Sequence, residues 1–106
     1  MRTGIGGKVI AMKSTYRKSF VIWGTGVMGK VAYGWLGAQN VMGFIDQNPS
    51  LQGKSYDDKP VLSFQESIQK FPGAYIIITP KDTASIVEKL SEHHYEAYSF
   101  LADIVY

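Results

Sequence analysis

Three glycines at a fixed spacing are the residues of this chain that point most directly to chemistry. Gly24, Gly26 and Gly29 form the pattern G-x-G-x-x-G within the phrase GTGVMG. Glycines so spaced permit a tight turn, let the backbone approach a diphosphate and let the next helix pack closely on the preceding strand. Free amides at a helix start, together with the positive end of the helix dipole, bind anions. The pattern therefore predicts a phosphate site made of unpaired backbone amides at residues 25–28.

The surroundings of these glycines match those of a dinucleotide-binding turn, which follows a strand, opens a helix and precedes a strand that ends in an acid. The apolar residues 19–23 predict a buried strand directly before the turn. Apolar residues spaced by three and four predict a helix over Val27–Ala38. Val41–Asp46 predicts the second strand, and its acid lies 17 residues past Gly29. The sequence therefore meets all three conditions.

Asp46 has two interpretations. Its carboxylate would accept hydrogen bonds from ribose hydroxyls and would repel a 2′-phosphate, which favours NAD or a plain nucleotide over NADP. Alternatively, Asp46 only caps the turn that continues with Asn48 and Pro49. Both interpretations place it at the carboxyl end of a strand.

A second group of polar residues follows the most strand-like segment of the chain, AYIIIT at residues 74–79. Ligands of open α/β sheets bind beyond the carboxyl ends of the strands, so Thr79, Pro80 and Lys81 are expected to line the pocket. The complete set of expected binding residues is Gly24, Thr25, Gly26, Val27, Met28, Gly29, Asp46, Thr79, Pro80 and Lys81.

Several kinds of active site are excluded by composition and spacing. The chain has no cysteine, which excludes a disulfide framework, thiolate metal sites and a cysteine nucleophile. His93 and His94 fall in the last turn of an expected helix, point about 100° apart and cannot share one metal ion. That turn is expected at the end of the sheet opposite the glycines, which favours a helix-capping role. With no Tyr-x-x-x-Lys pair and no Ser/His/Asp set, no catalytic residue and no metal ligand is expected.

Strands and helices are expected to alternate along the rest of the chain. Residues 51–59 read as a polar loop, and residues 60–62 read as a short extended piece. Ser63 and Glu66 form a capping box that opens a helix. Asp82 or Thr83 is expected to cap the next helix, and residues 97–100 form a last strand. Residues 101–106 are expected to extend that strand or to dock across the sheet edge.

This order of elements predicts an α/β fold in three layers around a parallel sheet of about four strands. The first helix is expected to turn one apolar face to the sheet, consisting of Met28, Val31, Ala32, Trp35 and Leu36.

Length and composition predict one folded domain. The 106 residues are 45% apolar and 19% charged, which is typical of a globular protein. Residues 1–18 are basic and without a clear period, so they are expected to be an arm or linker before a domain over residues 19–106. Residues before Asp46 carry +6 and the remainder carries −4. This asymmetry suits a polyanionic ligand, or a solvated leader that counters an acidic body. No membrane span, signal peptide or nucleic-acid-binding pattern is found, which favours a cytoplasmic protein.

Four phrases, FVIWGTGVMGK, VMGFIDQNP, KPVLSF and YIIITP, resemble the small Rossmann domains of bacterial glycan biosynthesis over roughly residues 18–100. These are the N-terminal domain of bacillosamine-type sugar acetyltransferases and the CoA-binding-like domain of nucleotide-sugar dehydratases and methyltransferases. The resemblance implies that the first phrase cradles phosphates through Gly24, Thr25, Gly26 and Gly29. It also implies that Asp46 contacts the nucleoside and that Thr79 and Pro80 line the pocket. Lys59 stands where the family usually has a glycine, which changes the adjoining loop.

The sequence thus favours a Rossmann-like nucleotide-binding module whose ligand is a UDP-linked nucleotide-sugar or NAD. It would serve a polysaccharide biosynthesis enzyme without being catalytic alone. Because four strands make only half of a doubly wound sheet, a homodimer or a covalently linked catalytic domain would supply the rest. One alternative is a fragment of an NAD-dependent oxidoreductase or epimerase, and another is a degenerate Rossmann domain used for assembly.

Overall fold

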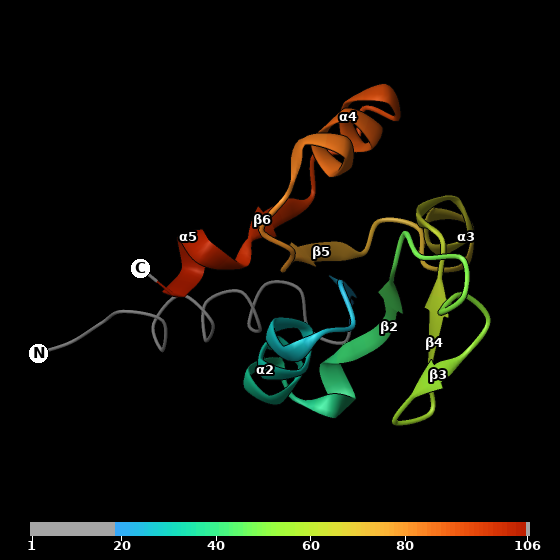
Figure 1. Ribbon diagram of the computed structural model, residues 1–106, viewed down its shortest axis with the longest axis vertical. Coiled ribbons are helices and arrows are strands. Elements are labelled where there is room, and N and C mark those ends of the chain that lie inside the picture. Colours follow the sequence, from blue (N-terminus) through green and yellow to red (C-terminus); the bar gives the residue numbers. More distant parts are fainter. Residues whose placement is uncertain (1–18, 106) are drawn as a thin grey trace, which may run out of the picture.

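The computed structural model describes residues 19–105, so the expected basic arm at residues 1–18 lies outside the described part (Figure 1). Within that part, six strands form one sheet in the order β3-β4-β2-β1-β5-β6. The parallel strands are β4 (Lys59–Leu62), β2 (Val41–Ile45), β1 (Phe20–Trp23), β5 (Tyr75–Ile78) and β6 (Tyr98–Phe100). The edge strand β3 (Ser55–Tyr56) runs antiparallel to β4. The chain is therefore an α/β protein with a mostly parallel sheet.

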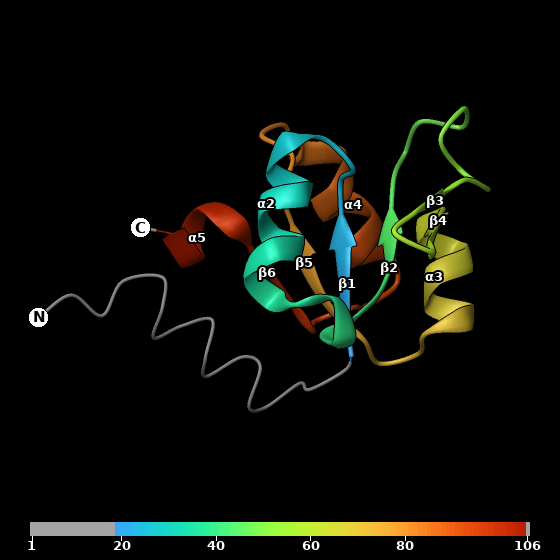
Figure 2. The same cartoon turned by 90° about the horizontal axis from the view of Figure 1, so that it is seen from below.

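Helices cover both faces of the sheet and give three layers (Figures 1 and 2). The helices are α2 (Val27–Leu36), α3 (Phe64–Lys70), α4 (Ala84–Glu92) and α5 (Leu101–Val105), with a short 3₁₀ turn at Ala38–Asn40. Residues of α2 and α5 share one buried core with Phe20, Ile22 and Phe44. Residues of α3 and α4 share the other with Val21, Trp23 and Ile45. Successive residues of each central strand thus point to opposite faces, and both are buried.

The expected number of four strands is wrong because the segment after β2 returns as a hairpin. Asp57 and Asp58 join β3 to β4 with φ angles of 52° and 63°. This is the left-handed conformation of a tight two-residue hairpin turn, which Asn-Gly or Asp-Gly normally signals. The hairpin brings Lys59–Leu62 into parallel pairing with β2, at Phe44 and Ile45. Part of the expected polar loop is therefore sheet.

Two expectations about helices also need correction. The buried face of α2 is Gly29, Ala32, Tyr33 and Leu36, whereas Met28 and Trp35 are 42% and 38% exposed. The helix is rotated relative to the expected face because Gly29 lies directly against the turn that follows β1. Residues 101–105 form α5 instead of extending β6, because Leu101 and Ile104 are buried in the α2 side of the core.

The order of the sheet reverses beside β1 and places the candidate site. The chain passes from β1 through α2 to β2 on one side, whereas β5 lies on the other side of β1. The carboxyl ends of these parallel strands meet at one edge. In sheets of this type, a ligand crevice opens where the strand order reverses.

Candidate functional site

The glycine turn begins with a residue that must be glycine. Gly24 follows β1, has φ +112°, and its N–H donates to the Ile45 carbonyl at 2.7 Å. A Cβ atom at this position would lie 2.3 Å from the Thr79 hydroxyl oxygen. Both the backbone conformation and the lack of space therefore exclude a side chain.

Gly29 and Gly26 differ from each other in their surroundings. A Cβ on Gly29 would lie 2.1 Å from the Gly24 carbonyl oxygen, so this glycine sets how closely α2 approaches the end of β1. A Cβ on Gly26 would meet nothing within 4 Å. Gly26 is thus not required by packing within the described residues, and its backbone is open to an approaching molecule.

The start of α2 presents unpaired donors. Gly26 is the N-cap residue, no side chain caps the helix, and its first turn contains no acid. An α-helix leaves its first four N–H groups without partners in the helix. No acceptor for the amides of Gly26, Val27 and Met28 is seen in residues 19–105. Val27 is 78% exposed and Met28 42%, so solvent reaches this helix end.

The expected free amide at Thr25 is wrong. The Thr25 N–H donates to Asp46 Oδ2 at 3.3 Å, and the Thr25 hydroxyl donates to the same oxygen at 2.8 Å. The reason is that β1 and β2 are neighbours, so the residues after them meet at the sheet edge. Within the described residues, the amides of the turn that have no acceptor are therefore those of residues 26–28.

The capping role expected for Asp46 is confirmed, and its carboxylate also contacts the glycine turn. One oxygen contacts the glycine turn through Thr25, and the other accepts the Asn48 N–H at 3.0 Å, as in a capped turn. A carboxylate has about four acceptor positions, and three donors occupy this one. Asp46 thus lies beside the glycine turn, partly buried, with capacity for a further hydrogen bond.

Thr79 and Pro80 contact the turn from the other side. The Thr79 hydroxyl donates to the Trp23 carbonyl at 2.8 Å, and Pro80 Cδ would lie 3.2 Å from a Cβ on Gly24. Lys81 is exposed and lines a separate cavity of about 370 Å³ toward β6, together with Thr79 and Pro80. Thr79 and Pro80 therefore lie next to the glycine turn, whereas Lys81 lies away from it, at the cavity toward β6.

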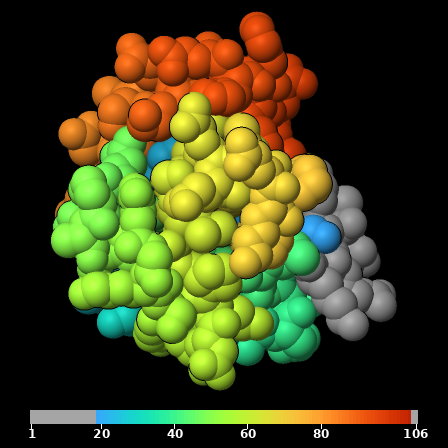
Figure 3. All heavy atoms as spheres, turned by 90° about the vertical axis from the view of Figure 1, so that its right-hand side faces the viewer, coloured from blue at the N-terminus to red at the C-terminus, as the bar shows by residue number. Residues whose placement is uncertain are grey.

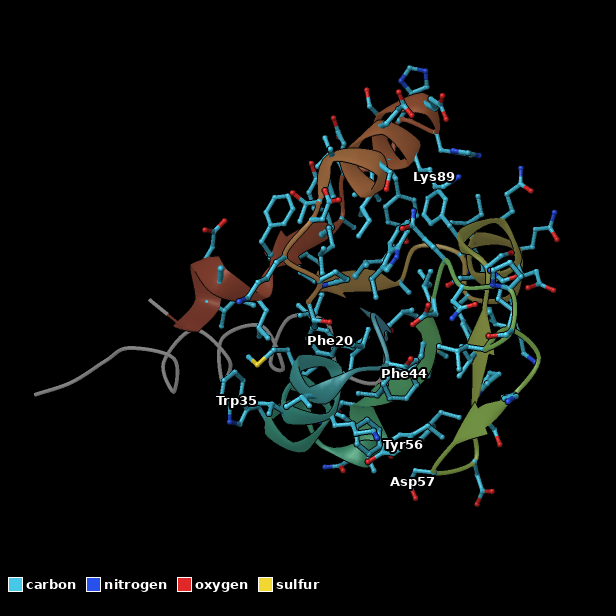
Figure 4. All side chains as sticks on the ribbon, viewed as in Figure 1. Phe20, Trp35, Phe44, Tyr56, Asp57 and Lys89 are labelled. Atoms are coloured by element: carbon cyan, nitrogen blue, oxygen red, sulfur yellow. The ribbon has the colours of Figure 1, made fainter. Side chains whose placement is uncertain are left out.

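A cavity of about 280 Å³ opens on the Asp46 side of the turn, between α3 and α4. Trp23, Asp46 and Phe64 line it, together with Lys89 and Glu92 of α4 and its C-cap residue His93. Figure 3 views this side, with α4 in orange above α3 in yellow, and Figure 4 labels Lys89 on α4.

The expected position of His93, at the end of the sheet opposite the glycines, is wrong. Its ring meets Phe64 edge-on at 5.1 Å, and Phe64 stacks on Trp23 at the carboxyl end of β1. This packing of α4 against α3 brings the histidine to the cavity of Asp46. The expected capping role is confirmed, since Nδ1 lies 2.9 Å from the Lys89 carbonyl oxygen. Only the contact between helices reveals this residue, and no local motif signals it.

Within residues 19–105, no three His, Cys, Asp or Glu side chains are placed to hold a metal ion together. No helix in that range is both long and apolar enough to cross a membrane.

Comparison with known proteins found no matching family model, no similar curated protein and no similar solved structure.

Proposed function

We propose that this chain is a Rossmann-like nucleotide-binding module. The phosphates would bind to the amides of Gly26, Val27 and Met28, and the ribose would bind to Asp46. The observation that carries the proposal is the uncapped, exposed start of α2 beside a carboxylate at the tip of the next strand. Helix N-termini of this kind bind phosphate, and a strand-end acid binds ribose hydroxyls.

The strand order supports the same proposal. The strand order reverses beside β1, and parallel strands lie on both sides of that point: β2 and β4 on one side, and β5 and β6 on the other. A ligand could therefore extend from Asp46 across the glycine turn to Thr79 within one chain. This arrangement supports a crevice that has both of its sides within one chain.

The ligand class proposed is a UDP-linked nucleotide-sugar or NAD, bound on behalf of a polysaccharide biosynthesis enzyme in the cytoplasm. Calorimetry with both ligands separates this role from that of an oxidoreductase or epimerase fragment. Preference for the UDP-sugar, or equal affinity for NAD and NADH, supports the first, whereas tighter binding of NAD with a difference between NAD and NADH supports the second.

A specific contact favours a third candidate, a degenerate domain used only for assembly. Thr25 already occupies one oxygen of Asp46 through two hydrogen bonds, as a purely structural link between β1 and β2 would. Under this alternative, no nucleotide would raise the melting temperature. A true ligand at 100 times its Kd would stabilise the fold by about 2.7 kcal/mol.

The test is a Gly26→Asp variant with Gly34→Asp as its matched control. Both glycines have open space where a Cβ would be, and both lie at exposed positions in or beside α2. Aspartate is a favoured N-cap residue, so Gly26→Asp keeps the helix start. Its charge would repel a phosphate, weakening binding by roughly tenfold or more.

We expect thermal-shift and calorimetric titration to show binding by the natural chain and by Gly34→Asp, with loss in Gly26→Asp. Equal affinities in the two variants would place the ligand elsewhere and reject the proposal.

A further inference from the structure

Two buried aromatic side chains form one wall of the cavity beside Asp46. Trp23 and Phe64 are 1% and 5% exposed, and their rings stack with centroids 5.2 Å apart. The cavity volume of about 280 Å³ is smaller than that of most sites for whole drug-sized ligands. It therefore suits one ring system of a larger ligand.

The charges around this cavity disfavour a phosphate. Asp46 and Glu92 contribute two carboxylates, whereas Lys89 contributes one ammonium. A neutral group with N–H donors is favoured, because carboxylates only accept hydrogen bonds. Phosphates are thus directed to the start of α2, and a neutral heterocycle to the cavity.

His93 adds an oriented acceptor. A carbonyl oxygen only accepts hydrogen bonds, so the contact with the Lys89 carbonyl at 2.9 Å places the proton of the neutral ring on Nδ1. Nε2 then carries a lone pair, and no partner for it is seen in the part of the chain that the structure describes. The edge-on contact with Phe64, at 86° between the ring planes, holds the imidazole in place.

We propose that this cavity binds the base of the nucleotide and selects a base with an exocyclic amino group, which donates a hydrogen bond to His93 Nε2. The inference rests on the proposed function and narrows its ligand. Adenine and cytosine carry such an amino group, whereas uracil and hypoxanthine carry a carbonyl in its place. An adenine nucleotide such as NAD is therefore preferred over a UDP-sugar.

The test is calorimetric titration of the full chain with AMP and with IMP, which carry an amino group and a carbonyl, respectively, at C6 of the purine, IMP carrying a proton on N1 as well. We expect AMP to bind the natural chain roughly tenfold more tightly, since IMP would place a carbonyl oxygen, a second acceptor, against the lone pair of Nε2. His93→Phe keeps a ring against Phe64 but has no nitrogen, so the AMP to IMP ratio should fall close to one.

His94→Asn is the control. His94 lines a different groove, along β6, and its φ of 52° is one that asparagine tolerates. This variant should keep the full AMP to IMP ratio. Circular dichroism of both variants checks that they are folded.

Two results would overturn the inference and leave the proposed function intact. One is equal affinity of the natural chain for AMP and IMP, with binding still lost in Gly26→Asp. The other is an unchanged AMP to IMP ratio in folded His93→Phe. The first uses no histidine variant, so it decides the matter even if His93→Phe fails to fold. Absence of binding by any nucleotide would reject the proposed function itself.

Discussion

At the scale of single residues, each of the three positions in the turn has a different physical reason for carrying glycine. Gly24 has a positive φ, and Gly29 lies so close to the Gly24 carbonyl that a Cβ would not fit. Gly26 has neither constraint within the described chain. A glycine without a packing reason, at the exposed N-cap of a helix, is consistent with an approaching ligand. Gly26 is therefore the residue at which binding and folding are most cleanly separated.

Among the described residues, Tyr33 has a strongly raised pKa. It lies in the α2 side of the core, donates a hydrogen bond to Asp57 Oδ2 and packs against Phe44 and Tyr56. Figure 4 shows Phe44, Tyr56 and Asp57 gathered beside α2 and the β3–β4 hairpin. Burial, and then the hydrogen bond to Asp57, raise the pKa of Tyr33 to about 12.

This pKa predicts a loss of stability at high pH. The neutral phenol is favoured in the folded chain, so its contribution is complete below pH 10, the ordinary pKa of tyrosine. The contribution is lost as pH rises from 10 to about 12. In urea titrations, the difference in unfolding free energy between the natural chain and Tyr33→Phe should be constant from pH 7 to 9 and shrink above pH 10. A difference that stays constant to pH 11.5 would contradict the assigned pKa.

Much of the residue-level site could be predicted from sequence. The glycine turn, Asp46 and Thr79 come together at one edge of the sheet, because each directly follows a parallel strand. His93 and the bond between Thr25 and Asp46 could not be predicted, because they depend on distances across the sheet edge and between α3 and α4.

At the scale of elements, α2 contains two glycines with opposite expected effects. Gly34 is exposed and lies in the last turn of the helix, where a Cβ would meet nothing within 4 Å. Gly29 lies one turn earlier, where a Cβ would lie 2.1 Å from backbone. The same substitution by alanine therefore separates helix propensity from packing.

We expect Gly34→Ala to stabilise the chain by roughly 0.5–1 kcal/mol, because alanine restricts the unfolded chain and favours helix. Gly29→Ala should destabilise it by roughly 1–3 kcal/mol, since α2 must move away from β1. Chemical denaturation measures both. Stabilisation by alanine at both positions would show that α2 does not lie as close to the glycine turn as described.

Elements with local signals were predicted well, and elements defined by pairing were not. The capping box of Ser63 and Glu66 is confirmed, with both reciprocal hydrogen bonds formed at the start of α3. The hairpin of β3 and β4 was missed because Asp57-Asp58 lacks the glycine that usually marks such a turn. The inward face of α2 was misplaced because contact at Gly29, and not the apolar pattern, sets its rotation.

At the scale of the whole molecule, the α/β class and the layered arrangement could be predicted from alternating strands and helices. The strand order could not, since sequence does not show on which side of β1 a later strand pairs. That order matters for the proposed function, because it places β2 and β5 on either side of the glycine turn. Asp46 and Thr79 thereby flank the turn from opposite sides.

The most direct test of the central claim is a ¹⁵N–¹H NMR titration of the full chain with NAD and, in parallel, with a UDP-sugar. Binding of phosphate at the start of α2 predicts that the largest changes in amide shifts occur at Gly26, Val27 and Met28, with smaller changes near Asp46. The account would be contradicted if saturating ligand left those three amides unshifted, or if the largest changes lay along β6.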